Sequence, residues 1–201
     1  MTTPENESTP SFARLQELLH AAAEQFRAHG YTGSTTREIA EQLGWQKPSI
    51  YYYVKSKEEL LYLVCSDCLR HIYQEVSAAV AHAPTHQQRL QTLILTHMDV
   101  ALAHQDQFAT TLLEMRHLTG RMLKTVRGLH DDYEQLVERI LREAQTAGVL
   151  RADVPPKYLM LMLLGMLNWS AFWYKAGEEL TPKALGVRML EQFLAGAQAR
   201  P

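Results

Sequence analysis

Apolar side chains recur along this chain with the period of an α-helix, and no stretch alternates apolar and polar residues as a β-strand would. The first stripe has members three or four residues apart: Leu15, Leu19, Ala22 and Phe26. Gly30 follows it and is expected to end that helix. Similar stripes recur at 90–101 and 133–144. The pattern predicts an all-α fold of about nine helices, with no internal repeat.

Two short helices separated by a tight turn are predicted next. The second helix opens at a capping box of Thr35 and Glu38, in which each side chain accepts a hydrogen bond from the other residue's backbone N–H. It ends at Gly44 after about two turns. Pro48 suits the first turn of a third helix, which is expected to reach Tyr53. Two such helices joined by a turn form a helix-turn-helix, the unit that places a helix in the major groove of DNA.

The rest of the chain is predicted to be a larger helical body. Its main helices are bounded by caps, prolines or glycines and are expected at 56–81, 87–104, 131–147, 155–177 and from residue 182 onward. Ser56 with Glu59 forms a second capping box at the start of the first of these. Irregular helical segments, punctuated by Gly120 and Gly128, are expected across 106–126.

The most hydrophobic part of the chain is an uncharged run at 158–174. A membrane-spanning helix needs about 20 apolar residues, whereas this run is shorter and carries Asn168 and Ser170. We therefore expect a helix buried on two sides and not a membrane span. In so small a protein, burial on two sides favours an interface between subunits.

Composition narrows the class of protein. Hydrophobic residues make up 46% and charged residues 21% of the chain, an ordinary balance for a globular protein. The formal net charge is −2, so DNA binding would have to use a local basic surface. Residues 1–10 are polar, show no signal peptide and are expected to be a disordered tail. Two cysteines, Cys65 and Cys68, are too few for a disulfide framework, and a cytoplasmic protein is expected.

Local charge supports a DNA-binding role for the helix-turn-helix. Between Gly30 and Lys57, four basic residues stand against two acidic ones: Arg37, Lys47, Lys55 and Lys57 against Glu38 and Glu41. On the third helix Gln46 can pair with adenine, Lys47 with guanine or a phosphate, and tyrosine hydroxyls suit phosphates. The alternative is a small helical hairpin whose charges are only a solvated face. Two capping boxes, a turn glycine and a run of tyrosines coincide here and argue against that alternative.

The segment YTGSTTREIAEQLGWQKPSIYYYVKSKEEL resembles the N-terminal signature of TetR-type transcriptional regulators, and the likeness covers 12–64. It implies a helix-turn-helix head at 11–55 and a ligand-binding and dimerisation domain at 56–201, in a homodimer joined through the last two helices. The positions that it implies for DNA binding are Thr35, Thr36, Gln46, Lys47, Pro48, Ser49, Tyr51, Tyr52 and Lys57. Trp45 and Val54 depart from the family's usual small aliphatic residue and phenylalanine, which puts the packing of the turn in doubt.

The segment LNWSAFWYKAGEELTPKAL, at 167–185, resembles the dimer-helix region of the family's acyl-CoA-responsive branch. That likeness implies a repressor that leaves a pseudo-palindromic operator when an acyl-CoA of fatty-acid or aromatic-acid metabolism binds. Candidate effector-binding residues are His97, Ala101, Arg116, Tyr133, Leu136, Met166, Trp169, Phe172 and Trp173. Candidate dimer-interface residues are Leu163, Leu167, Tyr174, Leu190 and Phe193. The plainer interpretation of the aromatic residues is that they are core and interface side chains.

Other interpretations stay open at this point. Four basic residues could meet the phosphates of a CoA or be only a solvated surface: Arg116, Arg121, Lys124 and Arg127. The runner-up function is a regulator of an efflux gene that responds to a lipophilic drug. Activation in place of repression is a further alternative.

A metal-dependent oxidoreductase of the helical-bundle type is the remote alternative. Glu17 with His20, and Glu114 with His117, have the Glu-x-x-His spacing of di-iron bundles. The apolar stripe of the first helix turns Glu17 away from the core, however. Three further potential ligands, at intervals of three along one helix, would converge poorly on an ion: Cys65, Cys68 and His71. Motifs for a nucleophile elbow, a P-loop or a zinc protease do not occur, so we expect no catalytic residue, cofactor or metal.

Overall fold

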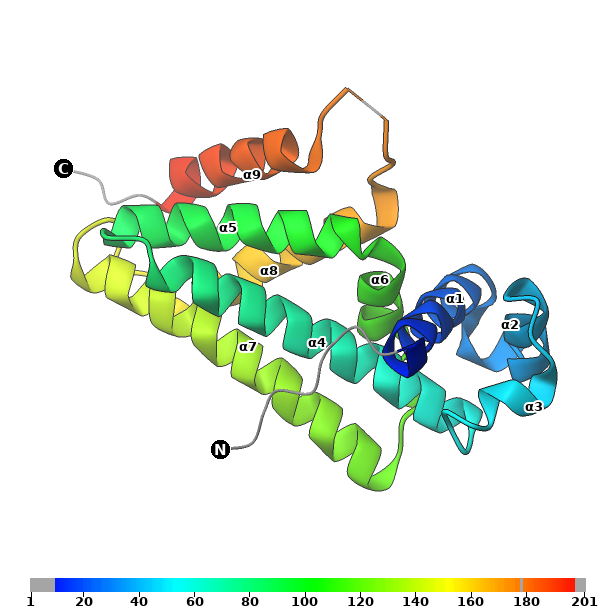
Figure 1. Ribbon diagram of the computed structural model, residues 1–201. Helices are drawn as coiled ribbons and strands as arrows, with labels where there is room; N and C mark the ends of the chain where they lie inside the picture. Colours follow the sequence, from blue (N-terminus) through cyan, green and yellow to red (C-terminus); the bar gives the residue numbers. More distant parts are fainter. Residues whose placement is uncertain (1–9, 178, 198–201) are drawn as a thin grey trace.

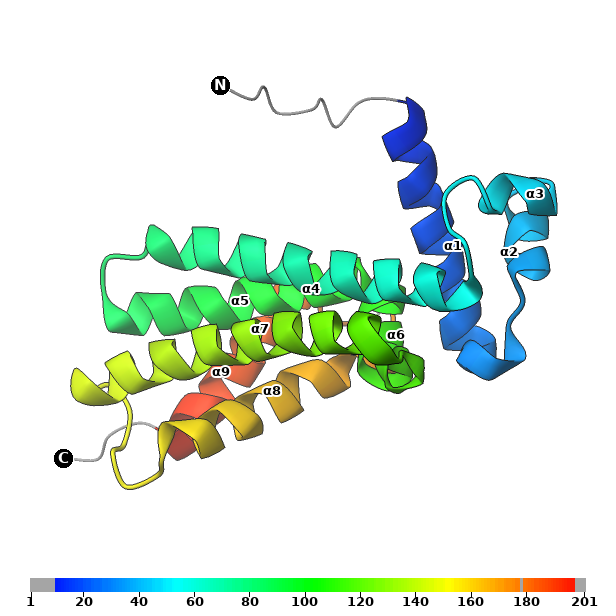
Figure 2. The same cartoon turned by 90° about the horizontal axis from the view of Figure 1, so that it is seen from below.

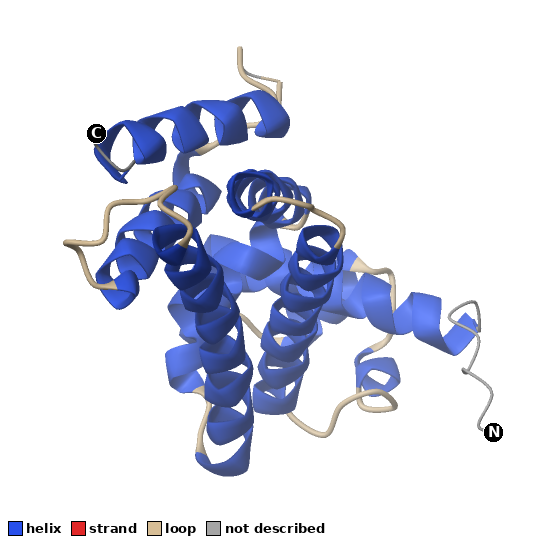
Figure 3. Cartoon of the chain, turned by 90° about the vertical axis from the view of Figure 1, so that its left-hand side faces the viewer, coloured by secondary structure: helices blue, strands red, loops and turns tan. Residues whose placement is uncertain are grey.

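The computed structural model describes residues 10–177 and 179–197, and this part of the chain consists of helices joined by turns and loops (Figure 3). The α-helices in it are α1 (Pro10–Gly33), α2 (Thr36–Gln42), α3 (Lys47–Ile50), α4 (Lys57–Ala81), α5 (His86–Ala103), α6 (Gln105–Glu114), α7 (Gly120–Thr146), α8 (Pro156–Trp173) and α9 (Pro182–Ala197). A single 3-10 turn, η1 (Met115–His117), follows α6. The predicted all-α fold is confirmed.

The helices form a small head and a longer body (Figures 1 and 2). α1, α2 and α3 gather at one end, and α4 runs from that end along the body. In the body α4 packs against α5 and α7, α5 packs against α9, and α7 packs against α8. α6 contacts both α1 and α4, so it lies where the head meets the body.

α4 contributes to both hydrophobic cores. Its first turns share the head core with side chains from the three preceding helices; the largest fully buried members include Phe26, Ile39, Ile50, Leu60 and Leu61. Farther along α4, Ile72, Val76 and Val80 belong to the larger core of the body. Burying a side chain of this size contributes about 1.5–3 kcal/mol, so both ends of α4 are firmly held. α4 therefore connects the packing of the body with that of the head.

The cap signals at the head are confirmed in part. Thr35 and Glu38 form the reciprocal capping box at the start of α2. At the start of α4, the Ser56 hydroxyl accepts from the Glu59 N–H at 3.0 Å. The Glu59 carboxylate, however, accepts from the backbone N–H one residue before Ser56. The second predicted box is therefore a one-sided cap.

Several helix ends differ from the prediction. At Gly30 the backbone leaves the helical region (φ 72°, ψ 160°), as expected, but a further turn continues to Gly33. α3 ends at Ile50, before the tyrosine run, which forms a turn. α8 ends at Trp173 and not at Gly177, because the next residue has an extended backbone. No described helix, α8 included, is long and apolar enough to cross a membrane.

α7 is longer than predicted. It is continuous from Gly120 to Thr146 and passes through Gly128, where irregular segments and a later start had been expected. A glycine inside a helix costs only about 1 kcal/mol relative to alanine. Val126 before it and Leu136 after it are buried on the same helix, and their packing outweighs that cost.

Candidate nucleic-acid interface and effector region

The residues expected to contact DNA on α3 and in the turn after it share an exposed face. The exposed members are Gln46, Lys47, Pro48, Ser49, Tyr51 and Tyr52. Tyr52 is 80% exposed, whereas the neighbouring Ile50 is fully buried in the head core. Lysine, glutamine and tyrosine side chains bind phosphates and base edges, so this face has the chemistry of a recognition surface.

α2 holds the tyrosine face in place. The hydroxyl oxygens of Thr36 and Tyr51 lie 3.3 Å apart, which joins the start of α2 to the turn after α3. Thr35 is exposed, and both its N–H and its hydroxyl donate to the Glu38 carboxylate at 2.8 Å. The Thr35 hydrogen bonds lower the pKa of Glu38. The Thr35 hydroxyl is thus committed to the helix cap.

Lys57 is engaged within the head. Its ammonium donates to the carbonyl oxygens of Tyr31 and Ser34, the latter at 2.7 Å, and lies 4.3 Å from the centre of the Tyr31 ring. Burial lowers the pKa of Lys57, and the Glu38 carboxylate opposes that shift. This corrects the expectation that Lys57 faces a phosphate, because its ammonium instead closes the segment between α1 and α2. Its partners lie far back in the chain, where no local pattern points to them.

The two departures from the family pattern pack within the head. The Trp45 ring stacks on Tyr53 with centroids 5.8 Å apart, and the guanidinium of Arg14 lies 5.8 Å from the Trp45 ring. Val54 is buried in the head core. The larger side chain at Trp45 therefore ties the turn to α1 and leaves the exposed face of α3 intact.

A polar cluster joins the head to the body where α1 meets η1. The backbone N–H of Tyr31 donates to the buried Glu114 carboxylate at 3.2 Å. Nε2 of His117 lies 3.2 Å from the Glu114 carboxylate, and the His117 ring stacks on Tyr31 with centroids 5.1 Å apart. Glu114 and His117 thus serve this junction, which accounts for one of the two Glu-x-x-His pairs.

A second junction ties α1 to the end of α8. Arg27 donates to Asp106 of α6 at 2.7 Å and to the carbonyl oxygen of Ala171 at 3.1 Å. Gln105 donates to the same Ala171 carbonyl at 3.0 Å and to that of Tyr174 at 2.8 Å. Sequence reasoning missed these residues, because Arg27 and Ala171 are 144 residues apart and no local pattern connects them.

The other potential metal ligands predicted from their spacing lie on the surface of α1 or along α4. Glu17 is exposed, as predicted, and His20 pairs with Glu24 at 3.2 Å on the surface of α1. Cys65 and Cys68 are free, buried thiols whose pKa burial raises to about 12, so they stay protonated. Within the described residues, one cluster of three side chains on α7 has its potential ligand atoms close together: His130, Asp131 and Glu134. The sequence spacing had not predicted this cluster.

A buried polar pair lies at the centre of the body. Nδ1 of His97 and the hydroxyl of Tyr133 are 2.7 Å apart, and both residues are buried. Burial lowers the pKa of His97 to about 3, with Asn168 opposing, so the imidazole is neutral at pH 7. Nε2 of His97 and Oδ1 of Asn168 are buried without a hydrogen bond of good geometry, although the Asn168 side chain is the hydrogen-bonding neighbour that raises the pKa of His97. These three polar side chains therefore form a buried cluster within the apolar core of the body.

The nine candidate effector residues do not line one space. His97, Ala101, Tyr133 and Leu136 are buried in the body core. Met166 and Phe172 are half-buried against that core. Arg116, Trp169 and Trp173 are exposed. The structure therefore divides the predicted set into an interior group and a surface group.

α8 has a buried face and an exposed apolar face. Leu163 and Leu167 are fully buried in the core of the single chain, and Tyr174, Leu190 and Phe193 are also buried there. This corrects the predicted dimer set, because Leu163 and Leu167 have no surface left to offer a second chain. Large apolar side chains lie exposed elsewhere on α8, and we call them the outer face of α8: Tyr158, Leu161, Met162, Trp169 and Trp173. A contiguous apolar surface of this kind marks an interaction site.

Sequence profiles of two protein families match the chain. The profile described as "Bacterial regulatory proteins, tetR family" matches residues 18–63. The profile described as "Tetracyclin repressor-like, C-terminal domain" matches residues 83–197. The first covers most of the head and the second covers most of the body.

Curated relatives align over nearly the full length. The fatty acid metabolism regulator protein of Bacillus subtilis is 21% identical over 184 residues, which cover 91% of this chain and 95% of that protein. The HTH-type transcriptional repressor KstR2 of Mycolicibacterium smegmatis is 25% identical over 194 residues, covering 96% of this chain and 94% of the relative.

Solved structures show the same fold. The ketosteroid transcriptional regulator KstR2 of Mycobacterium tuberculosis superposes with a TM-score of 0.86 at 23% identity, covering 93% of this chain and 96% of the other. AibR, solved in complex with isovaleryl coenzyme A and operator DNA, superposes with a TM-score of 0.80 at 23% identity, covering 89% and 97%. The chain belongs to the TetR family and is a DNA-binding transcriptional regulator, not an enzyme.

Proposed function

We propose that this chain acts as a homodimeric repressor that an acyl-CoA releases from a pseudo-palindromic operator. One observation carries the effector class: a protein named for fatty-acid metabolism and a structure named for bound isovaleryl coenzyme A both align with nearly the whole chain. The KstR2 relatives are named as repressors, which favours repression. FasR of Mycolicibacterium smegmatis, named as an activator, aligns over only 110 residues.

The exposed face of α3 is the surface that we propose reads the operator. Gln46, Lys47, Ser49 and Tyr52 are exposed together and would approach base edges and phosphates in a major groove. The exposed Tyr51 would contact the phosphate backbone beside it, and the buried Thr36 would hold the Tyr51 hydroxyl in position.

The outer face of α8 is the surface that we propose pairs with a second copy of the chain. Its large apolar side chains are exposed in the single chain, and Trp169 is 63% and Met162 61% exposed. A two-fold dimer would bring the same face of both chains together and remove these side chains from water. Two heads held by one dimer would read half-sites about 34–36 Å apart.

The interior around His97 is where we propose the acyl end of the effector binds. Nε2 of His97 and Oδ1 of Asn168, which make no hydrogen bond of good geometry in the described chain, would supply polar partners for a thioester or amide among apolar neighbours. The efflux-regulator alternative has weaker support. The tetracycline repressor protein class D of Escherichia coli is 41% identical to this chain, but only over 51 residues, which are 24% of the chain.

The effector acts on DNA binding through the elements that join head and body. α4 belongs to both cores, and Arg27 ties α1 to the end of α8. An effector that fits one arrangement of these helices better than another shifts the separation of the heads, by no more than its difference in affinity for the two states.

A gel shift on the DNA upstream of the gene, at fixed moderate salt with and without palmitoyl-CoA, tests the function. Release of a sequence-specific complex by palmitoyl-CoA is the expected result. A specific complex that ignores acyl-CoAs of every chain length would contradict the effector class and leave the DNA-binding regulator in place. The Lys47→Ala variant, which removes an exposed cation of the reading face, should shift the DNA less at every concentration.

A further inference from the structure

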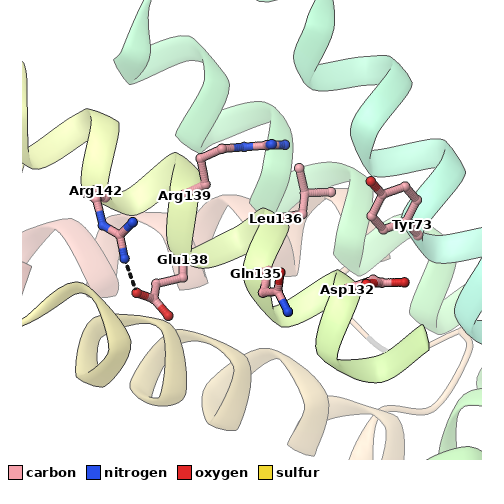
Figure 4. A pocket seen from close by; sticks show the side chains of 7 residues that line it. All are labelled: Tyr73, Asp132, Gln135, Leu136, Glu138, Arg139 and Arg142. Atoms are coloured by element: carbon pink, nitrogen blue, oxygen red, sulfur yellow. Dashed lines mark hydrogen bonds and ion pairs between the residues drawn. The ribbon is translucent and has the colours of Figure 1, made fainter. Parts of the chain in front are cut away.

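A groove runs along α7 where it packs on α4, and its lining residues belong neither to the DNA-reading face nor to the buried pair of His97 and Tyr133. Three adjoining hollows of about 340, 230 and 470 Å³ form it. All three are lined by Asp132, the first two share Tyr73, and the last two share Leu129. Figure 4 shows the hollow of about 340 Å³, with Tyr73 facing the α7 side chains. We call this continuous surface the α4–α7 groove.

The α4–α7 groove is rich in cations although the whole chain has a net charge of −2. Its charged lining residues are Arg70, Arg121, Lys124, Arg139 and Arg142 against Asp132 and Glu138. Arg142 is paired with Glu138. In the described chain the other four cations form no ion pair. A groove lined by unpaired cations attracts a ligand with several negative charges.

Gly128 leaves part of the groove without a side chain. It lies inside α7, lines the groove and is exposed, and a Cβ added there would meet nothing within 4 Å. Neither packing nor a special backbone conformation therefore requires a glycine, although alanine would suit the helix better. The missing side chain leaves the surface of α7 open at this end of the groove.

The groove also offers a surface for a planar apolar group. Tyr73 is 37% exposed beside the cations, and Leu129 and the buried Leu136 lie next to it. Clustered phosphates together with a planar ring are the chemistry of a nucleotide. A fatty acid carries a single negative charge and a neutral drug carries none, so neither would bind four unpaired cations as well as a ligand with several phosphates.

We propose that the α4–α7 groove binds the phosphorylated nucleotide of a CoA, with Arg121, Lys124 and Arg70 toward its phosphates and Tyr73 beside its adenine. This inference rests on the proposed function and extends it. Because Arg70 and Tyr73 belong to α4 and the other cations to α7, the nucleotide bridges the two helices. Binding thus draws on the helix that continues into the head, which gives the nucleotide part of the effector a direct effect on DNA binding.

Calorimetric titration of the full-length protein with CoA and with adenosine 3′,5′-bisphosphate tests the site. The groove variant is Arg121→Gln with Lys124→Gln, and the matched control is Lys157→Gln with Lys183→Gln, two exposed cations outside the groove. Losing two charge-assisted contacts should weaken binding of both probes at least about tenfold in the groove variant. The control variant should bind both probes as the wild type does. Gly128→Met, which fills the groove without changing charge, should weaken binding as well.

The outcomes separate this inference from the proposed function. Equal CoA affinity in the wild type and in the groove variant, or no measurable CoA binding, overturns the groove. If palmitoyl-CoA releases operator DNA equally from both proteins, the groove falls and the acyl-CoA effector stands. If the nucleotide probes bind in a groove-dependent way but no acyl-CoA releases DNA, the groove stands and the proposed effector falls.

Discussion

Lys47 and Lys57 carry the same charge in opposite surroundings. Lys47 is exposed on α3, whereas the Lys57 ammonium is held by two carbonyl oxygens and the Tyr31 ring. We expect Lys47→Ala to weaken operator binding and to lower the slope of log K against log salt by about one unit, with stability unchanged. Lys57→Met should keep the salt slope and lower the free energy of unfolding by about 1–2 kcal/mol. Salt titrations of operator binding measure the slope, and urea unfolding measures the stability. A reduced salt slope for Lys57→Met would show that Lys57 contacts a DNA phosphate after all.

His97 makes stability depend on pH. Its pKa in the folded chain is about 3, below the value of about 6.5 that an unfolded histidine has. Between these values the unfolded chain binds a proton that the folded chain does not, so stability falls as pH drops below about 6.5. Between pH 7 and pH 5 the wild type should lose about 2 kcal/mol more than His97→Gln, whose amide can still bond to Tyr133. Urea unfolding at both pH values measures this; identical losses in the two proteins would contradict a buried, neutral His97.

At the scale of single helices, Gly128 lets the cost of a helical glycine be measured. No neighbour lies within 4 Å of a Cβ added there, so Gly128→Ala should raise the free energy of unfolding by about 0.5–1 kcal/mol. Gly186 in α9 is the matched contrast, because an added Cβ would lie 3.2 Å from Leu95 and 3.4 Å from Met98. Gly186→Ala should therefore destabilise the protein. Thermal unfolding of the two variants decides; destabilisation by Gly128→Ala would mean that α7 needs its glycine.

The elements that sequence predicts well are those whose signals are local. The Thr35–Glu38 box and the stripe of α1 depend on residues within a turn or two of one another, and the structure contains both. The unbroken course of α7 was not foreseen, because the weak effect of Gly128 is overruled by packing against other helices. In the candidate site the exposed face of α3 followed from periodicity. The partners of Lys57 could not, because its carbonyl acceptors are 23 and 26 residues away.

At the scale of the whole molecule, Arg27 is the test of how the head senses the body. Its guanidinium bonds to Asp106 of α6 and to the Ala171 carbonyl at the end of α8. We expect Arg27→Ala to bind the operator within a few-fold of the wild type and to show a smaller fold-change when effector is added, because coupling between sites needs a physical link. Arg188→Ala, which breaks a pair with Glu191 inside α9, is the control. Operator titrations with and without palmitoyl-CoA measure the coupling. An unchanged effector response in Arg27→Ala would mean that the coupling runs through α4 and does not need Arg27.

The two faces of α8 distinguish the fold from the assembly. Leu167 is fully buried in the single chain, while Met162 is 61% exposed on the outer face of α8. Met162→Glu places a charge in the proposed interface and should shift the protein from dimer to monomer with its helix content retained. Leu167→Glu should instead unfold the body, because the charge would lie in the core without a partner. Light scattering and circular dichroism separate the two results. A Met162→Glu protein that stays dimeric would place the interface elsewhere. A folded monomer that binds a full operator far more weakly than the wild type would show that two joined heads are needed to read it.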